Sequence, residues 1–338
     1  MDSDRIRSYD ELEKQIGNTV LVQYVGEVPN GNKIWIKREC DNPFGSHYDR
    51  VYLKLFRHYE ETGKINPEDG VFETTSGAAG ISFAGLGRIL GYKCFVAIPA
   101  GGEKAREEAL KKVLPSKDHL ILTPAEEYVN AFPDFIKKFW KETGYFFMNH
   151  SMSSRGTNNE LTLSSLEGIT REVLEEIDID YFVPAVGNGS SVLGPARILP
   201  SDSKVVPFET FQSAVAYELK SPGEYERRFG IKPGTLSRHQ LPGTSYQGIS
   251  FPHINNSIEL LEDVILVSGT KMDEEYERLT GKNDSRSLPH WDDGNIADHE
   301  DLGRSSRAGL AVALEIAKKV SENNLLIIGY DKIERYDS

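Results

Sequence analysis

Three short segments of the chain combine glycine with hydroxyl side chains, a composition suited to binding an anion. They are TTSGAAG at 74–80, GNGSS at 187–191 and GRSSRAG at 303–309. Each one leads into a stretch with helical spacing, so its free backbone N–H groups would lie at the positive end of a helix dipole. A carboxylate or a phosphate group is the ligand that such a position attracts.

The segment 187–191 is the best phosphate-binding candidate of the three. Its two glycines permit close approach of the backbone, and Ser190 and Ser191 add hydroxyl donors. It has no Walker lysine and does not fit GxGxxG, which argues against an NTPase or a dinucleotide-binding fold. A tight strand-to-helix turn is the alternative explanation. Taken alone, the other two segments are better explained as helix caps, although a serine in 303–309 could also hydrogen-bond a ring nitrogen.

A fourth segment, NPFGSHYDR at 42–50, carries a Gly-Ser pair at the start of a predicted helix. Such a pair usually positions a reactive group, and two residues after Ser46 stands Tyr48. A phenol exchanges a proton near neutral pH only if its pKa is lowered from about 10.

Short apolar runs alternate along the chain with longer amphipathic stretches. Strand followed by helix, repeated in this way, predicts an α/β protein with a doubly wound parallel sheet. The predicted strands are 71–75, 94–98, 119–123, 181–186, 205–209 and 325–330. The predicted helices are 50–62, 78–90, 103–113, 125–143, 160–177 and 191–199, with a further helix after 303–309.

Taken together and in this order, the segments resemble the fold type II pyridoxal-phosphate enzymes, specifically the cysteine synthase and cystathionine β-synthase group. The resemblance covers nearly all of the chain. IGNTVLV at 16–22 is similar to the family's opening IGNTPLV, and NPFGSHYDR resembles its NPxGSxKDR. TSGAAG at 75–80 and GNGSS occupy the places of TSGNTG and GTGGT. QGI at 247–249, the serine pair 305–306 and DKIERY at 331–336 resemble the family's QGI, GISSG and DSGERY.

The resemblance also exposes two departures. Tyr48 stands where the family places the lysine that links covalently to pyridoxal phosphate, and a phenol has no amine with which to form a Schiff base. Ala78 and Ala79 replace the Asn and the second Thr of TSGNTG, so side-chain hydrogen bonds are lost there. The phosphate end of the cofactor site therefore looks kept, whereas its reactive end looks rebuilt.

The resemblance assigns the other site residues by position. The catalytic candidates are His47 and Tyr48, and the cofactor-binding candidates are Gly187, Asn188, Gly189, Ser190, Ser191, Ser305 and Ser306. The substrate-binding candidates are Thr75, Ser76, Gly77, Ala78 and His150, although an ordinary loop histidine is an equally good explanation of His150. Lys54 and Lys37 could be proposed as substitutes for the missing lysine, but a solvated or snorkelling charge is expected at both.

Two functions stay open on this basis. In one, the protein is an enzyme that acts without a Schiff-base lysine and holds pyridoxal phosphate non-covalently, or binds another phosphorylated ligand. The resemblance implies β-replacement or β-elimination on an amino acid such as an O-activated serine. In the other, it is a catalytically silent relative that serves as a binding or regulatory protein. Fold alone does not separate the two.

The resemblance implies two domains with the site in the cleft between them. Residues 1–45 and 150–338 are expected to form the larger, cofactor-binding domain, and residues 46–149 the smaller, mobile one. Both belong to the architecture of tryptophan synthase β-like enzymes, in which helices flank twisted parallel sheets. A homodimer is implied in the same way.

Composition limits the possible partners. Asp and Glu number 52 against 39 Lys and Arg, and the resulting net charge of −13 disfavours nucleic acid as a partner. Cys40 and Cys94 are far apart and are expected to be half-buried thiols, and no signal-peptide or membrane-spanning pattern is present, so a cytoplasmic protein that does not bind membranes is expected. The His- and Asp-containing stretch 289–301 fits no metal-binding spacing and is expected to be a surface loop; no metal site is predicted.

Overall fold

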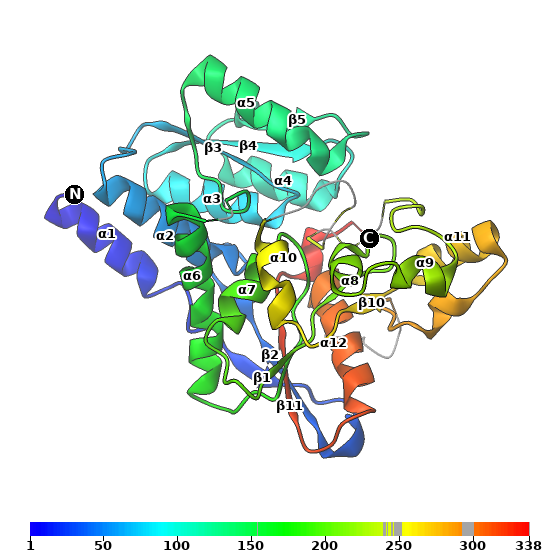
Figure 1. Cartoon of the computed structure of the whole chain (residues 1–338). Coiled ribbons are helices and arrows are strands. Elements are labelled where there is room, and N and C mark those ends of the chain that lie inside the picture. Colours follow the sequence, from blue (N-terminus) through cyan, green and yellow to red (C-terminus); the bar gives the residue numbers. More distant parts are fainter. Residues whose placement is uncertain are drawn as a thin grey trace.

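The computed structural model describes residues 1–153, 155–238, 241, 243–244, 246, 252–292 and 301–337. Its strands form a five-stranded sheet in the order β1-β2-β11-β7-β8, a four-stranded sheet in the order β5-β4-β3-β6, and a pair, β10-β9. Every pairing between these strands is parallel except that of β1 with β2. The predicted α/β fold with parallel sheets is confirmed (Figure 1).

The elements are short and closely spaced. The strands are β1 Leu21–Gln23, β2 Lys33–Lys37, β3 Gly70–Thr74, β4 Lys93–Pro99, β5 Leu120–Thr123, β6 Phe146–Phe147, β7 Tyr181–Phe182, β8 Lys204–Val205, β9 Phe208–Thr210, β10 Ile265–Val267 and β11 Asn324–Ile328. The helices are α1 Ser3–Glu13, α2 Tyr48–Glu61, α3 Ala78–Ile89, α4 Lys104–Val113, α5 Phe132–Thr143, α6 Thr157–Leu174, α7 Ser190–Ala196, α8 Val215–Lys220, α9 Glu224–Phe229, α10 Pro252–Ser257, α11 Thr270–Thr280 and α12 Arg304–Ala317. No helix in the described ranges is both long and apolar enough to cross a bilayer.

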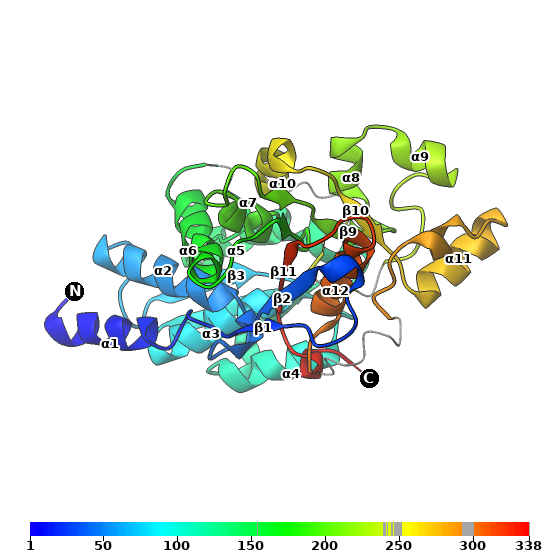
Figure 2. The ribbon, with the colours of Figure 1, turned by 90° about the horizontal axis from the view of Figure 1, so that it is seen from below.

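Helices cover both faces of each main sheet. Around the four-stranded sheet, α5 lies on one side and α3 and α4 lie on the other (Figure 1). Around the five-stranded sheet, α12 lies on one side and α6 and α7 lie on the other, as Figure 1 and Figure 2 agree. Strands buried on both faces read as continuous apolar runs, such as residues 325–328 of β11, and such runs located these strands in the sequence.

Several predicted boundaries are wrong, and proline explains two of them. The predicted helix 125–143 starts only at Phe132, after a 3₁₀ turn, because Pro133 has no N–H and fits only the first turn of a helix. The predicted strand 205–209 divides into β8 and β9, with Pro207 between them. Regular pairing of the predicted strand 181–186 ends at Phe182, and β5 begins at Leu120 rather than at His119.

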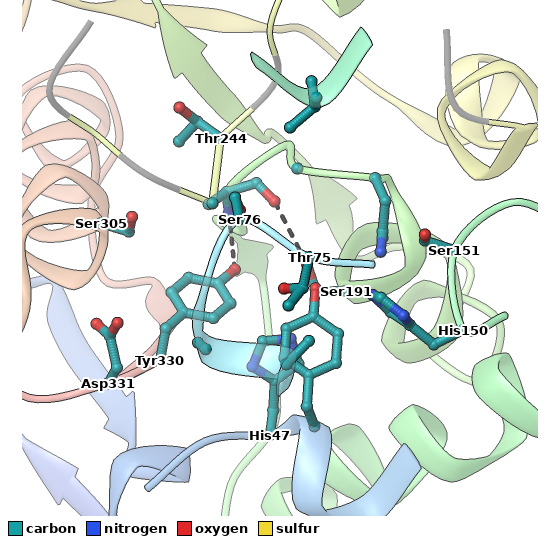
Figure 3. Close-up of a pocket in the computed structure, with 18 of the residues that line it drawn as sticks. His47, Thr75, Ser76, His150, Ser151, Ser191, Thr244, Ser305, Tyr330 and Asp331 are labelled. Carbon is teal, nitrogen blue, oxygen red and sulfur yellow. Dashed lines mark hydrogen bonds between the residues drawn. The ribbon is translucent and has the colours of Figure 1, made fainter. Parts of the chain in front are cut away.

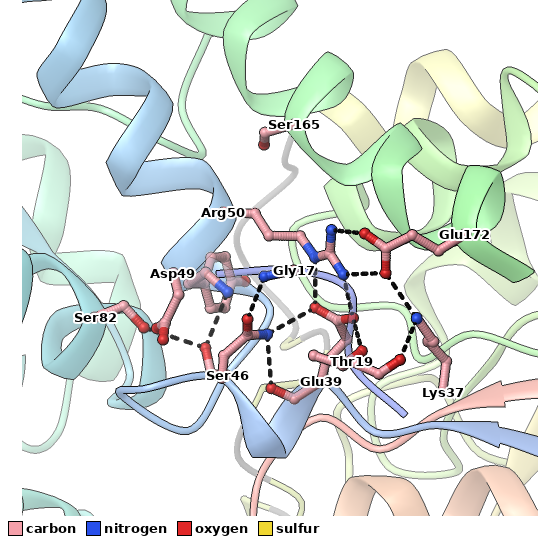
Figure 4. Close-up of polar contacts among 12 residues, drawn as sticks. Gly17, Thr19, Lys37, Glu39, Ser46, Asp49, Arg50, Ser82, Ser165 and Glu172 are labelled. Carbon is pink, nitrogen blue, oxygen red and sulfur yellow. Dashed lines mark hydrogen bonds and ion pairs between the residues drawn. The ribbon is translucent and has the colours of Figure 1, made fainter. Parts of the chain in front are cut away.

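A buried ionic network ties the start of α2 to the five-stranded sheet and α6 (Figure 4). Arg50 bonds Glu39 through Nε at 2.7 Å and Glu172 through Nη1 at 2.6 Å. Lys37 completes the network with an ion pair to Glu172 at 2.7 Å and a hydrogen bond to the Thr19 carbonyl. The expectation of a solvated or snorkelling charge at Lys37 is therefore wrong, since its side chain is 1% exposed.

The two cysteines are more deeply enclosed than expected. Cys40 and Cys94 are both free thiols and are buried rather than half-buried. Burial raises the pKa of Cys40 to about 12 and raises that of Cys94 as well. Both thiols are therefore protonated at neutral pH and act as small apolar side chains.

Candidate functional site

A cavity of about 90 Å³ lies where the carboxyl ends of β3, β7 and β11 approach one another. Ligands of open α/β sheets bind at this edge, because the loops that follow parallel strands converge there. The predicted residues that line the cavity are His47, Tyr48, Thr75, Ser76, Ala78, His150, Gly187, Asn188, Ser191 and Ser305. Four other candidates, Gly77, Gly189, Ser190 and Ser306, do not line it. Figure 3 shows the labelled residues of this set around the cavity.

Tyr48 opens α2 and is partly exposed to the cavity. Its backbone N–H donates to the Ser46 hydroxyl at 3.0 Å, so the predicted Gly-Ser pair positions this residue. Burial raises the pKa of Tyr48 to about 12, although a hydrogen bond with Asn188 acts in the opposite direction. The phenol is therefore neutral at physiological pH and serves as a hydrogen-bonding group, because the lowered pKa that proton transfer requires is not present.

His47 is a buried side chain with free polar atoms. Neither ring nitrogen has a hydrogen-bond partner among the described residues, and the ring packs against Tyr48 and Tyr330 with centroids 4.1 and 5.2 Å away. Burial lowers the pKa of His47 to about 4, so the ring is neutral at pH 7. Unpaired buried polar atoms of this kind are costly to stability.

Acidification is expected to destabilise the protein through His47. Because the folded-state pKa of about 4 lies below the unfolded value of about 6.5, the contribution of His47 is present above pH 6.5 and is lost as the pH falls toward 4. Urea unfolding of wild type is expected to lose about 2 kcal/mol more between about pH 7 and about pH 5 than His47→Asn does. Equal losses in the two proteins would show that His47 is readily protonated in the folded state.

His150 faces the cavity while a buried carboxylate holds its other side. Its Nδ1 lies 2.9 Å from the Tyr52 hydroxyl and 3.1 Å from Glu73 Oε2, and both partners are fully buried. The carboxylate favours a proton on Nδ1, which leaves Nε2 as an acceptor. The His150 ring stands edge-on to Tyr48, with centroids 5.2 Å apart. Of the residues around the cavity, His150 is thus better suited than Tyr48 to accept a proton.

The loop after β3 brings Thr75 and Ser76 to the cavity. Thr75 Oγ1 accepts the Gly77 N–H at 3.0 Å, so part of its hydrogen-bonding capacity is used within the loop. Above this loop lies Arg106 of α4, which also lines the cavity and is paired with Asp331 at 2.8 Å. Arg106 stands in a charged helix without a local motif, so the sequence gives no sign of its place at the cavity.

The predicted phosphate-binding segment is largely bonded to itself. Asn188 Oδ1 accepts from the Ser190 backbone N–H at 2.8 Å and from the Ser190 hydroxyl at 2.6 Å. The glycines are required for packing, since a Cβ on Gly187 would lie 2.3 Å from the Gly243 carbonyl oxygen and one on Gly189 2.4 Å from the Ile254 nitrogen. Of the two serines in this segment, only Ser191 lines the cavity.

The two serines at the start of α12 have different surroundings. Ser305 lines the cavity and hydrogen-bonds with Tyr336. The Ser306 hydroxyl accepts the Tyr330 N–H at 2.9 Å and is fully buried away from the cavity. Of this pair, only Ser305 lines the cavity.

The residues present do not fit a pyridoxal phosphate held by a Schiff base. Among the described residues around the cavity there is no lysine. Lys54 is exposed and donates to the Ser164 hydroxyl at 2.9 Å, and Lys37 is enclosed in the ionic network. No primary amine of these side chains lies at the cavity.

Two predicted features fall partly or wholly outside the described residues. The QGI segment at 247–249 is one of them. The other is the surface loop 289–301, of which residues 293–300 are not described. In its described part, His290 Nε2 lies 2.9 Å from Asp273 Oδ2.

Comparison with curated proteins finds cysteine synthases. The chain is 29% identical over 241 residues to cysteine synthase of Staphylococcus aureus (strain Mu50), an alignment that covers 68% of this chain and 74% of that protein. It is 27% identical over 344 residues to the putative mitochondrial cysteine synthase of Saccharomyces cerevisiae (strain ATCC 204508 / S288c), covering 98% and 83%.

The fold is shared with solved structures as well. One is a variant of O-ureido-L-serine synthase in which a lysine is replaced by alanine, solved with O-ureido-L-serine bound. It superposes with a TM-score of 0.74 at 21% identity, and the alignment covers 96% of this chain and 91% of that one.

The family model described as "Pyridoxal-phosphate dependent enzyme" matches residues 12–279. Since this match spans well over half of the sequence, the chain belongs to the pyridoxal-phosphate-dependent enzyme family, a membership that implies pyridoxal phosphate as cofactor.

Proposed function

We propose that this cysteine synthase-like protein binds an amino acid in the cavity between its two main sheets. Any pyridoxal phosphate or other phosphorylated ligand would be held there non-covalently. The observation that carries the proposal is the Tyr48 phenol at the cavity, together with the lack of a lysine among the described residues that line it. The O-ureido-L-serine synthase variant supports it, because that neighbour carries its amino-acid ligand although a lysine has been replaced.

The residues around the cavity can bind such a ligand and move one proton. Thr75, Ser76, Ser191 and Ser305 carry hydroxyl groups, and neither ring nitrogen of His47 has a hydrogen-bond partner in the part of the chain that the structure describes. His150 Nε2 can accept a proton while Glu73 stabilises the imidazolium that results. Because none of the described residues that line the cavity is a lysine that could move the α-proton or release product, we expect β-replacement or β-elimination to be slow at best.

A catalytically silent binding or regulatory protein is the second candidate. The loss of reactive side chains at Tyr48 and at Ala78 and Ala79 favours it. The two candidates differ in one observable, which is turnover. Product formation from an O-activated serine and sulfide, measured over hours at high protein concentration, would support the enzyme.

Absorbance and thermal stability together test the proposal. Purified protein is incubated with pyridoxal phosphate, desalted and scanned from the near ultraviolet to the visible. No band is expected to survive desalting, and borohydride treatment is expected to add no mass. L-serine, O-acetyl-L-serine or L-cysteine is expected to raise the melting temperature. A retained band would show that another lysine binds the cofactor, and no response to any of the three amino acids would refute the binding proposal.

The assembly and location are proposed on the same basis. We propose that residues 46–149 form a smaller, mobile domain and that residues 1–45 and 150–338 form the larger one; the four-stranded sheet lies wholly within the first set. We also propose a cytoplasmic homodimer. Light scattering coupled to size-exclusion chromatography would report a mass near 37.8 kDa if the protein is a monomer instead.

A further inference from the structure

We propose that Arg106 is the carboxylate-binding group of the cavity and thereby selects ligands that carry a small carboxylate, such as the α-carboxylate of an amino acid. The inference rests on the proposed function, which it deepens by naming the group that is recognised. Its basis is the placement of a buried guanidinium over the loop after β3, with one donor unused.

The Arg106 side chain packs directly against Gly77. The arginine projects from α4, and its stem lies so close to the loop that a Cβ on Gly77 would be 2.5 Å from Arg106 Cδ and 3.1 Å from Nη1. Gly77 also has φ +148°, a conformation that other residues rarely adopt. A side chain at position 77 would therefore displace the arginine, so the glycine keeps the guanidinium beside Thr75 and Ser76.

The guanidinium is held rigidly and away from bulk water. Arg106 is 3% exposed, and its Nη2 donates to Asp331 Oδ2 at 2.8 Å. The Tyr336 hydroxyl donates to the same carboxylate, while the Tyr336 ring lies under the guanidinium carbon, 4.7 Å from the ring centroid. A guanidinium fixed in this way loses little conformational entropy when it binds a ligand.

One donor of the guanidinium remains available. Arg106 Nε is buried and has no hydrogen-bond partner among the described residues. It shares this condition with the two ring nitrogens of His47, another residue that lines the same cavity. An anionic oxygen is the acceptor that a buried, unpaired guanidinium N–H favours most, and a planar carboxylate suits its geometry. The nearby hydroxyl groups of the loop would complete the contact.

Arginine side-chain NMR tests this role directly. Wild-type protein labelled with ¹⁵N-arginine is titrated with potassium acetate, and separately with potassium chloride at equal ionic strength. The Nε–H resonance of Arg106 is identified by its loss in Arg106→Lys. Acetate is expected to shift this resonance to saturation, whereas chloride is not. Gly77→Ala is expected to weaken acetate binding about tenfold or more, because the arginine is displaced.

The resonance of Arg304 serves as the internal control, since this arginine does not line the cavity. L-serine is expected to shift the Arg106 resonance and ethanolamine, which lacks the carboxylate, to leave it unchanged. If acetate shifts Arg106 but no amino acid binds, the role of Arg106 stands and the proposed function fails. If amino acids raise the melting temperature but leave Arg106 unshifted, the role of Arg106 is refuted and the proposed function stands. No shift with any carboxylate refutes the inference.

Discussion

Replacing Arg50 by methionine is expected to lower the free energy of unfolding by about 3–5 kcal/mol at neutral pH. Arg50 is the one cation in the ionic network that contacts both carboxylates, Glu39 and Glu172. Without it, Glu39, which is fully buried, keeps only neutral hydrogen-bond donors from Thr19 and Asn42. An unpaired buried charge is much more costly than a lost surface ion pair.

The pKa of Glu172 also depends on Arg50. Burial by itself would raise this pKa, but Arg50 and Lys37 lower it to about 2. A carboxyl whose folded-state pKa is depressed contributes stability above its unfolded value of about 4.5, and that contribution is lost as the pH falls toward 2. In the Arg50→Met variant this contribution shrinks, so its stability is expected to depend less on pH in that range.

A matched control lies on the same helix. Arg57 makes three ion pairs, with Asp10, Glu13 and Glu61, but their carboxylates are about half exposed. Arg57→Met is therefore expected to cost about 1 kcal/mol or less. Urea unfolding followed by circular dichroism compares the two variants. Similar losses in both would show that the network around Arg50 is no more stabilising than surface pairs.

The Tyr48→Lys variant is expected to bind pyridoxal phosphate covalently, which wild type is not. The substitution places an amine at the start of α2, in a cavity where burial lowers the pKa of a lysine and increases the neutral, nucleophilic fraction. His150 lies close enough to the position to exchange a proton with the new amine. The variant is incubated with pyridoxal phosphate, reduced with borohydride and analysed by mass spectrometry after digestion.

The quantity measured is the mass of the peptide that contains position 48. Mass gain there in Tyr48→Lys, with none in wild type or in Tyr48→Met, would show that the cavity still accepts the cofactor and lacks only the amine. Arg57→Lys adds a lysine to the same helix outside the cavity and controls for reaction at the surface. If Tyr48→Lys stays unmodified in excess cofactor, the cavity has lost the cofactor site itself, and another anionic ligand is the better candidate.

Most of the fold and the core of the site could be predicted from local patterns. Strand-then-helix alternation predicted a parallel α/β protein, and loops after parallel strands must meet at one edge of their sheets. That rule places Thr75 after β3 and Asn188 after β7, at the carboxyl ends of two different sheets, and only the packing of those sheets brings the two residues and Ser305 to one cavity. The order of the motifs along the chain also predicted that Tyr48 occupies the position of the family's lysine.

Local patterns failed where a single residue interrupts an element or where segments pack side by side. Pro133 and Pro207 shifted element boundaries because each lacks a backbone donor, a signal that was readable in the sequence. Ser190 and Ser306 looked like equivalents of Ser191 and Ser305, yet neither of them lines the cavity. Neighbours in sequence point in different directions, and only the packed backbone decides which one reaches the cavity.

The sequence by itself thus determined the fold class and the edge at which the cavity lies, and it led to the prediction that Tyr48 takes the place of the family's lysine. The tertiary structure decided the chemistry around that residue. It paired Arg106 with Asp331 and His150 with Glu73, and it enclosed Lys37 in an ionic network. These contacts join residues that are distant along the chain, and they arise from the docking of one sheet and its helices against the other. Charge, burial and pKa depend on such long-range neighbours, so no local spacing could predict them.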